Sequence, residues 1–306
     1  MSPRVFIGAS SFGMKDPAPI KLLEAAGLDV VPNPYGRRLN EEETIKLLAG
    51  FDGLIAGQEP LNRRVLESAA PTLKALARVG IGMDNVDQEA ARELGIKVSN
   101  TPDPPTQAVA ELTVAAMLAL LRGLMEMNAA MHDGIWSKTI YTGLADAKVL
   151  LVGYGRIGRR VADLIRPFGA HILVCDPMAT PESLAHGERL VGLYEGLAEA
   201  NVVSLHAAGA DTILDQAAFA AMRRGAILLN SARGGLIDEP ALIHALKAGI
   251  VAQAWVDTFW NEPYKGELIG FKQVLLSPHA ATYTMRCRHG METEAARNLI
   301  RDLGLK

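Results

Sequence analysis

A glycine-rich turn between an apolar run and a helix-periodic stretch constrains the fold of this chain more than any other feature. The turn, Gly153-Tyr154-Gly155-Arg156-Ile157-Gly158, follows the run Lys148 to Val152 and precedes the stretch Arg159 to Phe168. In a strand-turn-helix unit the first glycine makes the tight turn, the second lets a pyrophosphate approach the backbone, and the third lets the helix pack close to the strand. The N-terminus of the helix adds free N–H groups and a partial positive charge. The motif alone does not separate a nucleotide cradle from a structural turn, but its place between strand and helix favours a cradle.

An acidic residue at the end of the next strand indicates which dinucleotide would bind. The run His171 to Cys175 ends in Asp176, where a carboxylate can accept hydrogen bonds from both hydroxyls of an adenosine ribose. The 2′-phosphate of NADP would meet this carboxylate with no basic neighbour in Pro177 or Met178. The sequence therefore predicts NAD as the cofactor.

The composition is ordinary for a soluble enzyme. The 306 residues are 49% hydrophobic and 21% charged, which is ample for a sizeable core and suggests two domains. A net charge of -3 does not predict the basic face that phosphate-backbone binding requires, so we expect no nucleic-acid partner. The two cysteines, Cys175 and Cys287, do not make a disulfide framework, which favours a reducing, cytoplasmic setting.

No segment indicates export or a membrane partner. The N-terminal residues Pro3 to Gly8 resemble a first strand, without a charged region followed by a long apolar one. The strongest membrane candidate, Leu112 to Leu121, is bracketed by Glu111 and Arg122, and it is about half the roughly 20 residues needed to span a bilayer. We expect a buried or interface helix there.

Strand-like runs alternate with helix-periodic segments, which predicts parallel sheets with helices on both faces. In the first half we expect helices at Ile20 to Ala26 and Glu41 to Leu48, and strands at Val5 to Ala9, Asp29 to Val31, Gly53 to Ala56, Leu73 to Val79 and Lys97 to Ser99. The proline-rich segment Asn100 to Pro105 predicts a hinge. A helix from Thr106 to Met127 then leads into the unit with the glycine-rich turn, whose later strands are expected at Val202 to Leu205, Ala226 to Leu229, Ala252 to Val256 and Val274 to Leu276, before a last helix at Cys287 to Leu303. The expected fold class is α/β, with two Rossmann/flavodoxin-like doubly wound domains.

Three polar side chains follow neighbouring strand ends in the second half, where ligands of such sheets bind. They are Arg233, within Ser231-Ala232-Arg233-Gly234-Gly235, Glu262, within Asp257 to Pro263, and His279, within Ser277 to Ala281. Each alone has an ordinary explanation, as a surface ion pair, a solvated carboxylate or a packed histidine. Together, beside a nicotinamide, they form a working set for 2-hydroxy acid oxidation.

Each of the three would have a distinct role. Arg233 would bind the substrate carboxylate and polarise the reacting oxygen, for which a planar, permanently charged guanidinium is suited. His279 would remove the hydroxyl proton as hydride leaves Cα, or donate it in the reverse reduction. Glu262 would accept a hydrogen bond from the other imidazole nitrogen and orient the ring.

Six ordered motifs carry a family resemblance. They are Gly80 to Asp87, Asn100-Thr101-Pro102, the glycine-rich turn, Ser231 to Gly235, Asp257 with Glu262-Pro263, and Ser277-Pro278-His279. On these motifs the chain resembles the D-isomer-specific 2-hydroxyacid dehydrogenase family over essentially its full length. The resemblance implies a discontinuous substrate-binding domain, residues 1–101 and 283–306, an NAD-binding Rossmann domain, residues 102–282, and an active site in the cleft between them.

The resemblance also implies roles for individual residues, and we expect no metal. Arg156 and Ile157 would line the pyrophosphate beside Gly153, Gly155 and Gly158, Asp176 would bind the ribose, and Asp257 would bind the nicotinamide carboxamide. Backbone bordering the cofactor would come from Ala207, Ser231, Ala232 and Ala281. The N–H groups of Ile81 and Gly82 would hold the substrate carboxylate. A homodimer would form through the cofactor domain, with the helix Thr106 to Met127 and the arm containing Trp136 at its interface.

Within the family the likeness is closest to 3-phosphoglycerate dehydrogenases, through Ala77 to Gly82, Asp133-Gly134-Ile135-Trp136 and Ala295 to Leu299. Arg78 and Lys138 align with basic positions that can face a substrate phosphate in those enzymes, although both also fit solvated charges. Two features depart from the pattern: Gln58 stands where phosphoglycerate-specific members often carry a basic residue, and the loop from His206 to Asp211 replaces a proline-containing one. The chain ends at Lys306 without an added regulatory domain, so we expect no allosteric control through one.

We therefore expect an NAD-dependent enzyme that interconverts a small D-2-hydroxy acid and its 2-oxo acid, with 3-phosphoglycerate and hydroxypyruvate or glyoxylate as the main substrate candidates. Two alternatives stay open. One is an NAD(H)-sensing, corepressor-like binding protein without catalysis. The other is a phosphite or formate dehydrogenase of the same fold, although formate dehydrogenases typically carry an amide where Glu262 stands.

Overall fold

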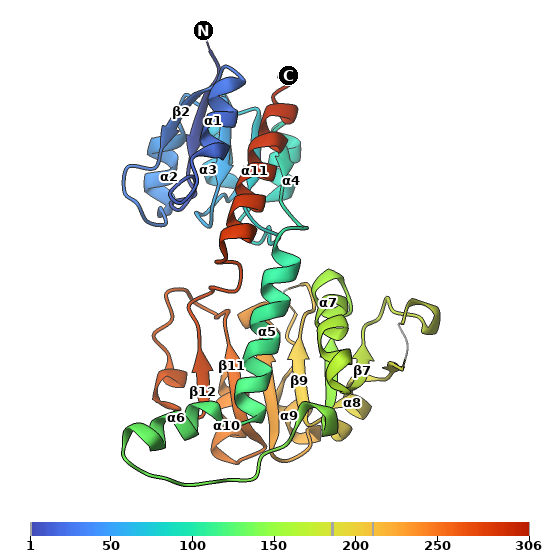
Figure 1. Cartoon of the computed structure of the whole chain (residues 1–306). Helices are drawn as coiled ribbons and strands as arrows, with labels where there is room; N and C mark the ends of the chain where they lie inside the picture. The colour runs from blue at the N-terminus through green and yellow to red at the C-terminus, as the bar shows by residue number, and fades with distance from the viewer. Residues whose placement is uncertain (1, 185–186, 210, 306) are drawn as a thin grey trace. The chain divides into compact units, whose positions relative to one another are not determined.

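The chain forms two compact units. A computed structural model describes residues 2–184, 187–209 and 211–305 (Figure 1). Unit 1 comprises the residues up to Pro105 together with Tyr283 and the residues after it, and unit 2 runs from Thr106 to Thr282. The first break thus lies between Pro105 and Thr106, four residues after the expected boundary at 101/102 and at the start of a helix that begins at Pro105.

Unit 1 is built on a five-stranded parallel sheet in the order β2-β1-β3-β4-β5. Its strands are β1 (Arg4–Ile7), β2 (Asp29–Pro32), β3 (Gly53–Ala56), β4 (Ala75–Arg78) and β5 (Lys97–Ser99). Its helices are α1 (Ala18–Ala25), α2 (Glu41–Leu48), α3 (Arg63–Ala69), α4 (Gln88–Glu93) and α11 (Met285–Asp302). The 2-1-3-4-5 order is that of flavodoxin-like sheets.

Local sequence explains where the helices of unit 1 begin. Asn40 accepts from the N–H of Glu43, whose carboxylate accepts from the N–H of Asn40, so α2 starts with a capping box. Asn62 and Asp87 cap α3 and α4, and each accepts from one backbone N–H without a reciprocal bond. The sequence did not predict α3 and α4, because seven and six residues are too few for a helical period to stand out.

Unit 2 contains a seven-stranded parallel sheet in the order β12-β11-β10-β9-β6-β7-β8. Its strands are β6 (Lys148–Val152), β7 (His171–Cys175), β8 (Arg189–Leu190), β9 (Val202–Leu205), β10 (Ala226–Asn230), β11 (Val251–Val256) and β12 (Val274–Leu276). Counted from β6, this is the 3-2-1-4-5-6 order of dinucleotide-binding sheets, with β12 added at one edge. The order reverses between β6 and β9, which is where such sheets bind their ligand.

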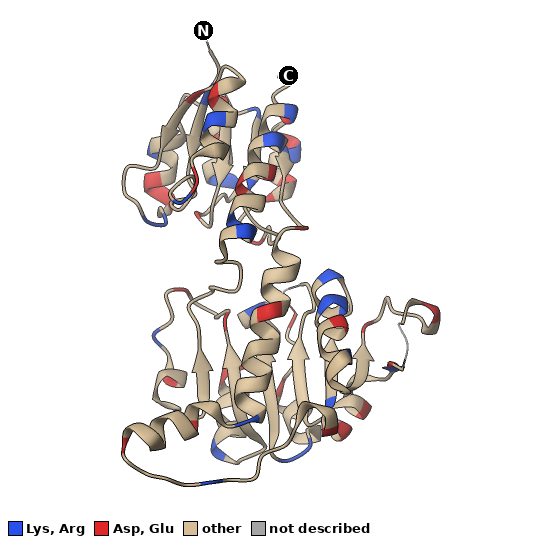
Figure 2. Cartoon of the chain, in the orientation of Figure 1, with Lys and Arg blue, Asp and Glu red and all other residues tan. Residues whose placement is uncertain are grey.

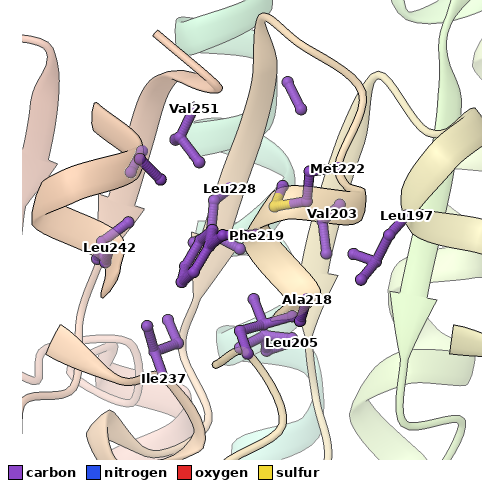
Figure 3. Close-up of a cluster of buried hydrophobic side chains, with 14 of the residues drawn as sticks. Leu197, Val203, Leu205, Ala218, Phe219, Met222, Leu228, Ile237, Leu242 and Val251 are labelled. Atoms are coloured by element: carbon purple, nitrogen blue, oxygen red, sulfur yellow. The ribbon is translucent and has the colours of Figure 1, made fainter. Parts of the chain in front are cut away.

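Helices cover both faces of this sheet. They are α5 (Pro105–Leu121), α6 (Leu124–His132), α7 (Arg156–Ile165), α8 (Leu193–Glu199), α9 (Gln216–Ala221) and α10 (Glu239–Lys247), with 3-10 turns η1 (Leu144–Asp146), η2 (Arg166–Phe168), η3 (Pro181–Ser183), η4 (Gly234–Leu236) and η5 (Glu267–Gly270). Side chains of α8, α9 and α10 form one buried cluster with the sheet, drawn in Figure 3 around Leu228 and Phe219. Those of α5 and α7 form another with Trp255. The predicted class of two doubly wound α/β units is confirmed.

The long helix expected from Thr106 to Met127 is wrong in one respect, because it breaks after Leu121. Gly123 adopts a left-handed conformation (φ 57°), and a Cβ there would lie 2.1 Å from the ring of Tyr141. The left-handed backbone favours glycine at this position, and α6 starts in a new direction at Leu124.

The apolar character of α5 has a plain structural reason. Figure 2 shows the helix almost free of charged residues, and Val114, Met117 and Leu120 are buried in the core of unit 2. In the described part of the chain, no single helix is long and apolar enough to cross a membrane, while α5 and α6 taken together, bent by 61°, meet the test of length and composition.

Candidate active site

The residues expected to bind and react lie mainly where the strands of unit 2 end. The glycine-rich turn follows β6, Asp176 follows β7, and Ala207 comes two residues after β9. The loops of Arg233, Glu262 and His279 follow β10, β11 and β12. Because all these strands are parallel, their carboxyl ends share one edge of the sheet.

The three glycines of the turn meet different surroundings. A Cβ on Gly153, whose φ is 95°, would lie 2.4 Å from the backbone N of Ala207, and one on Gly158 would lie 2.2 Å from the carbonyl oxygen of Gly153. Both positions therefore exclude a side chain. A Cβ on Gly155 would meet nothing within 4 Å. The backbone at Gly155 thus borders open space, as the close approach of a pyrophosphate requires.

The turn also presents unsatisfied donors to that space. The helix α7 begins at Arg156 with Gly155 as its N-cap, three residues earlier than the expected start at Arg159, since the glycine turn leads directly into helical backbone. Among the described residues, the N–H groups of Gly155, Ile157 and Gly158 have no acceptor. These donors and the open backbone fit the diphosphate of a dinucleotide.

Asp176, directly after β7, accepts hydrogen bonds from two backbone N–H groups. Its Oδ2 accepts from the N–H of Tyr154 (2.5 Å) and its Oδ1 accepts from the N–H of Met178 (2.7 Å), so it holds the glycine-rich turn. A carboxylate has about four acceptor positions, which leaves room for the two hydroxyls of a ribose. The half-buried side chain of Asp176 is thus suited to the predicted contact with NAD.

The residues after β9 form the other wall of the turn. The Nε2 atom of His206 lies 2.8 Å from Oγ of Ser204, and burial lowers the pKa of His206 to about 4, so its ring is neutral at neutral pH. Ala207 packs against Gly153 through its backbone. Of the loop from His206 to Asp211, Ala210 lies outside the described residues.

The loop of Arg233 is held in place by Asn230 and by the neighbouring loop that contains Phe259. The buried amide of Asn230 donates to the carbonyl of Arg233 (2.8 Å) and accepts from the N–H of Ala232 (3.0 Å). A Cβ on Gly234 would lie 2.2 Å from the backbone carbon of Phe259. This contact sets the Arg233 loop directly against the loop that carries Glu262. Ser231 is tied to α5, since its Oγ lies 3.3 Å from Oγ1 of Thr113.

Glu262 and His279 form a hydrogen-bonded pair. The Nδ1 atom of His279 lies 3.0 Å from each carboxylate oxygen of Glu262, and Oε1 of Glu262 also accepts from the N–H of Phe259 (3.1 Å). A carboxylate only accepts, so Nδ1 carries the proton toward Glu262 and Nε2 is the nitrogen left to exchange one with a substrate. The side chains are 35% and 26% exposed, so the pair can meet a ligand.

Asp257 is fully buried. Its carboxylate accepts from the N–H groups of Ala280 (2.9 Å) and Ala281 (3.1 Å). The family resemblance assigns Asp257 to the nicotinamide carboxamide and Ala281 to the border of the cofactor site. In the structure, the carboxylate of Asp257 also holds the backbone N–H of Ala281.

In unit 1 the predicted carboxylate-binding loop also follows a strand end. Among the described residues, neither the N–H of Ile81 nor that of Gly82 has an acceptor. Asn100 donates to the carbonyl of Ile81 (2.8 Å), and Thr101 accepts from the N–H of Gly80 (2.8 Å). The loop is thus fixed with two adjacent donors available.

The two basic residues of the substrate prediction have different surroundings. The guanidinium of Arg78 folds over Gly80 and donates to the carbonyl of Val79. Lys138 is exposed in the segment that leads from α6 to the amino end of β6. Unit 2 by itself therefore does not bring Lys138 to the edge that carries His279.

Sequence reasoning missed several residues that hold the site. Asn230 was detectable as a polar residue ending the apolar run of β10, and Gly234 as one of two adjacent glycines.

In unit 1 the sequence analysis also missed a buried carboxylate. Glu59 follows β3 and accepts from the N–H of Gly57 (3.0 Å). Burial raises the pKa of Glu59, while the charges of Arg78 and Arg38 oppose this shift. No group of three or more His, Cys, Asp or Glu side chains suited to a metal occurs among the described residues.

Known proteins resemble the chain in sequence and in fold. Residues 114–281 match the family model described as D-isomer specific 2-hydroxyacid dehydrogenase, NAD binding domain. D-3-phosphoglycerate dehydrogenase of Mycobacterium leprae is 36% identical over 86% of this chain and 52% of its own, and D-3-phosphoglycerate dehydrogenase 3, chloroplastic, of Arabidopsis thaliana is 35% identical over 86% and 46%. The chain spans about half the length of these curated relatives.

Solved structures agree along nearly the whole chain. The TT0316 protein from Thermus thermophilus superposes with a TM-score of 0.88 at 34% identity, covering 98% of this chain and 97% of that one. A glyoxylate reductase from Paecilomyes thermophila does so with a TM-score of 0.88 at 26% identity, covering 99% and 95%. The matched family model lies within unit 2, so unit 2 is an NAD-binding domain. The chain belongs to the D-isomer specific 2-hydroxyacid dehydrogenase family.

Proposed function

We propose that this chain is an NAD-dependent oxidoreductase that interconverts a small D-2-hydroxy acid and its 2-oxo acid. The observation that carries the proposal is the Glu262–His279 pair, with Nδ1 3.0 Å from both carboxylate oxygens, on the sheet edge that also bears the glycine-rich turn. A histidine fixed in this way can exchange a proton through Nε2 while its charge is balanced by the acid.

The residues divide the reaction among them. When bound, NAD accepts or supplies the hydride at the substrate Cα. Nε2 of His279 takes the proton of the hydroxyl in oxidation and returns it in reduction. Arg233 binds the substrate carboxylate and polarises the reacting oxygen. To unit 1 we assign further binding of that carboxylate, through the N–H groups of Ile81 and Gly82.

The names of the relatives point to two substrate classes, a phosphorylated acid and a small unphosphorylated one. Two relatives named D-3-phosphoglycerate dehydrogenase favour a phosphorylated acid, and the glyoxylate reductase favours a small unphosphorylated one. Arg78 supports the first choice as a cation beside the loop of Ile81. A panel of 2-oxo acids, including phosphohydroxypyruvate, hydroxypyruvate and glyoxylate, assayed with NADH and with NADPH, tests the function and the cofactor together.

The proton-transfer role is tested by His279→Asn, because asparagine tolerates the positive φ of this position. We expect kcat to fall by roughly 10² to 10⁴, as general acid–base catalysis contributes, while NADH binding measured by fluorescence titration persists. His171→Asn is the matched control, since His171 is exposed at the amino end of β7. Turnover within twofold of wild type in His279→Asn would remove His279 from the mechanism.

We also propose a homodimer that forms through unit 2, in a reducing, cytoplasmic setting. Large apolar side chains exposed between residues 124 and 140 support the dimer; these are Leu124, Met131, Ile135, Trp136 and Ile140. Large exposed apolar patches mark interaction sites, and these five side chains come from one segment of unit 2. The proposed cytoplasmic location rests on the two cysteines, which are both free thiols. Cell fractionation tests this location.

A further inference from the structure

A chain of hydrogen bonds leads from the core of unit 2 to the loop of His279. The indole N–H of Trp255, a side chain with 1% exposure on β11, donates to Oγ of Ser277 (2.9 Å). Oγ of Ser277 lies 2.5 Å from Oδ1 of Asp257. An indole N–H only donates and an ionised carboxylate only accepts. The hydroxyl proton of Ser277 therefore points to Asp257, and the chain has one fixed direction.

Asp257, oriented by Ser277, in turn holds the backbone around His279 through three hydrogen bonds. Its Oδ1 accepts from the N–H of Ala280 (2.9 Å), its Oδ2 from the N–H of Ala281 (3.1 Å), and its main-chain carbonyl from the N–H of His279 (2.8 Å). Three successive N–H groups thus converge on one residue. Because Asp257 is fully buried, its carboxylate depends on these partners for its orientation.

The loop needs such support because His279 is in a strained conformation. Its φ is 50°, and it is the one non-glycine residue with a positive φ among the described residues. A non-glycine residue is strained in such a conformation, which persists only where the surrounding structure determines it. The bonds to Asp257 supply that determination, and they fix the direction in which the imidazole leaves the backbone.

We propose that Trp255 and Ser277 are positioning residues for the proton transfer: acting through Asp257, they hold the backbone of His279 so that its ring meets both Glu262 and the substrate. Neither side chain takes part in the chemistry. This assignment rests on the proposed function of His279, and it gives Asp257 a role in the protein itself besides its predicted contact with the cofactor.

The test compares Ser277→Ala with Ser277→Thr, which keeps the hydroxyl. Misplacement of a catalytic group by about 1 Å can cost about a hundredfold in rate. We expect Ser277→Ala to lower kcat by about tenfold to a hundredfold while KM and NADH affinity stay within about twofold. We expect Ser277→Thr to recover most of kcat. Thr258→Val is the matched control, because the neighbouring buried hydroxyl of Thr258 has no hydrogen-bond partner among the described residues; it should leave kcat unchanged.

Trp255→Phe gives an independent readout of the same chain. If Trp255 acts only through Ser277, the double variant Trp255→Phe/Ser277→Ala should have the kcat of Ser277→Ala alone. Two separate structural losses would instead multiply. Multiplicative effects, or a Ser277→Ala enzyme with kcat within twofold of wild type, would overturn the proposal.

Hydrogen exchange keeps the proposal testable if no substrate is turned over. The amides of Ala280 and Ala281 should exchange slowly in the wild type and in Ser277→Thr, and at least tenfold faster in Ser277→Ala. Unchanged protection in Ser277→Ala would overturn the positioning role. Failure of the proposed function, by contrast, would show as absent turnover in a wild-type protein whose loop is still protected.

Discussion

Gly234 determines how close two loops of the candidate site can come. A Cβ at this position would lie 2.2 Å from the backbone carbon of Phe259 and 2.4 Å from the backbone nitrogen of Trp260. Backbone atoms cannot turn away as a flexible side chain can. The distance between Arg233 and Glu262 is therefore set by the absence of a side chain on the residue that follows the arginine.

Gly234→Ala should accordingly damage both stability and catalysis. Overpacking of this kind costs about 1–3 kcal/mol, and the Arg233 loop must shift away from Glu262. We expect a lower urea midpoint and a kcat reduced by at least tenfold. Gly270→Ala is the control, since a Cβ there meets nothing within 4 Å. A Gly234→Ala enzyme with wild-type midpoint and kcat would show that the loops tolerate separation.

Glu59 is a residue whose ionisation should oppose folding. Burial raises its pKa above the ordinary value of 4.5, so the folded state binds more protons than the unfolded state between these two values. Stability is thus lost as pH rises through that range. Glu59→Gln removes this loss and can still accept from the N–H of Gly57.

We therefore expect the free energy of unfolding at pH 7 to be higher in Glu59→Gln than in the wild type, with the difference vanishing below pH about 4, where both states are protonated. Urea titrations at several pH values measure this. Glu67→Gln, an exposed change on α3, should give no such pattern. A destabilised Glu59→Gln at pH 7 would mean that the attraction of Arg78 and Arg38 outweighs the burial.

Among the elements, α10 follows the Arg233 loop, and its start depends on the capping residue just before it. Asp238 precedes the helix and accepts from the N–H of Ala241 (2.8 Å). Loss of such a cap costs about 0.5–2 kcal/mol. We expect Asp238→Ala to lose stability in this range by urea unfolding and Asp238→Asn, which keeps the acceptor, to lose little. If Asp238→Asn lost as much stability as Asp238→Ala, the charge of Asp238, and not its capping hydrogen bond, would stabilise the helix.

The sequence predicted elements well where burial and length made a clear pattern. The buried strands β3, β6 and β7 were found with correct bounds because both faces are apolar or a turn motif follows. The two-residue strand β8 was missed, since it is exposed and has no apolar run. The break at Gly123 was missed as well, because a single glycine within a helix-periodic stretch does not by itself indicate that the helix ends.

The same division applies to the candidate site. Arg233, Glu262 and His279 could be predicted because each chemical group follows a recognisable strand end. The residues that hold them could not. The contact of Gly234 with Phe259, or the bond of Ser277 to Asp257, joins residues 20 or more positions apart. No local pattern encodes such a pair, so only the folded backbone reveals it.

For the whole molecule, the proposed dimer is open to direct measurement. Light scattering should give twice the 32.7 kDa of one chain. Trp136 and Ile140 are 79% and 100% exposed, and a second copy would bury them. We expect Trp136→Ser/Ile140→Ser to yield monomers, while Ile269→Ser, a change at an equally apolar exposed residue elsewhere in unit 2, leaves the mass unchanged. A monomeric wild type would rule the dimer out.

The left-handed backbone at His279 also bears on how this position can vary in evolution. Most side chains are disfavoured there, and asparagine, aspartate, histidine and glycine are the common exceptions. Of these four, only histidine offers a nitrogen base whose neutral and charged forms are both accessible near neutral pH. Histidine is thus the one residue type that both tolerates the positive φ of this position and can exchange a proton near neutral pH. A lineage that lost the proposed activity would be expected to drift first to asparagine or glycine, before the turn itself changed.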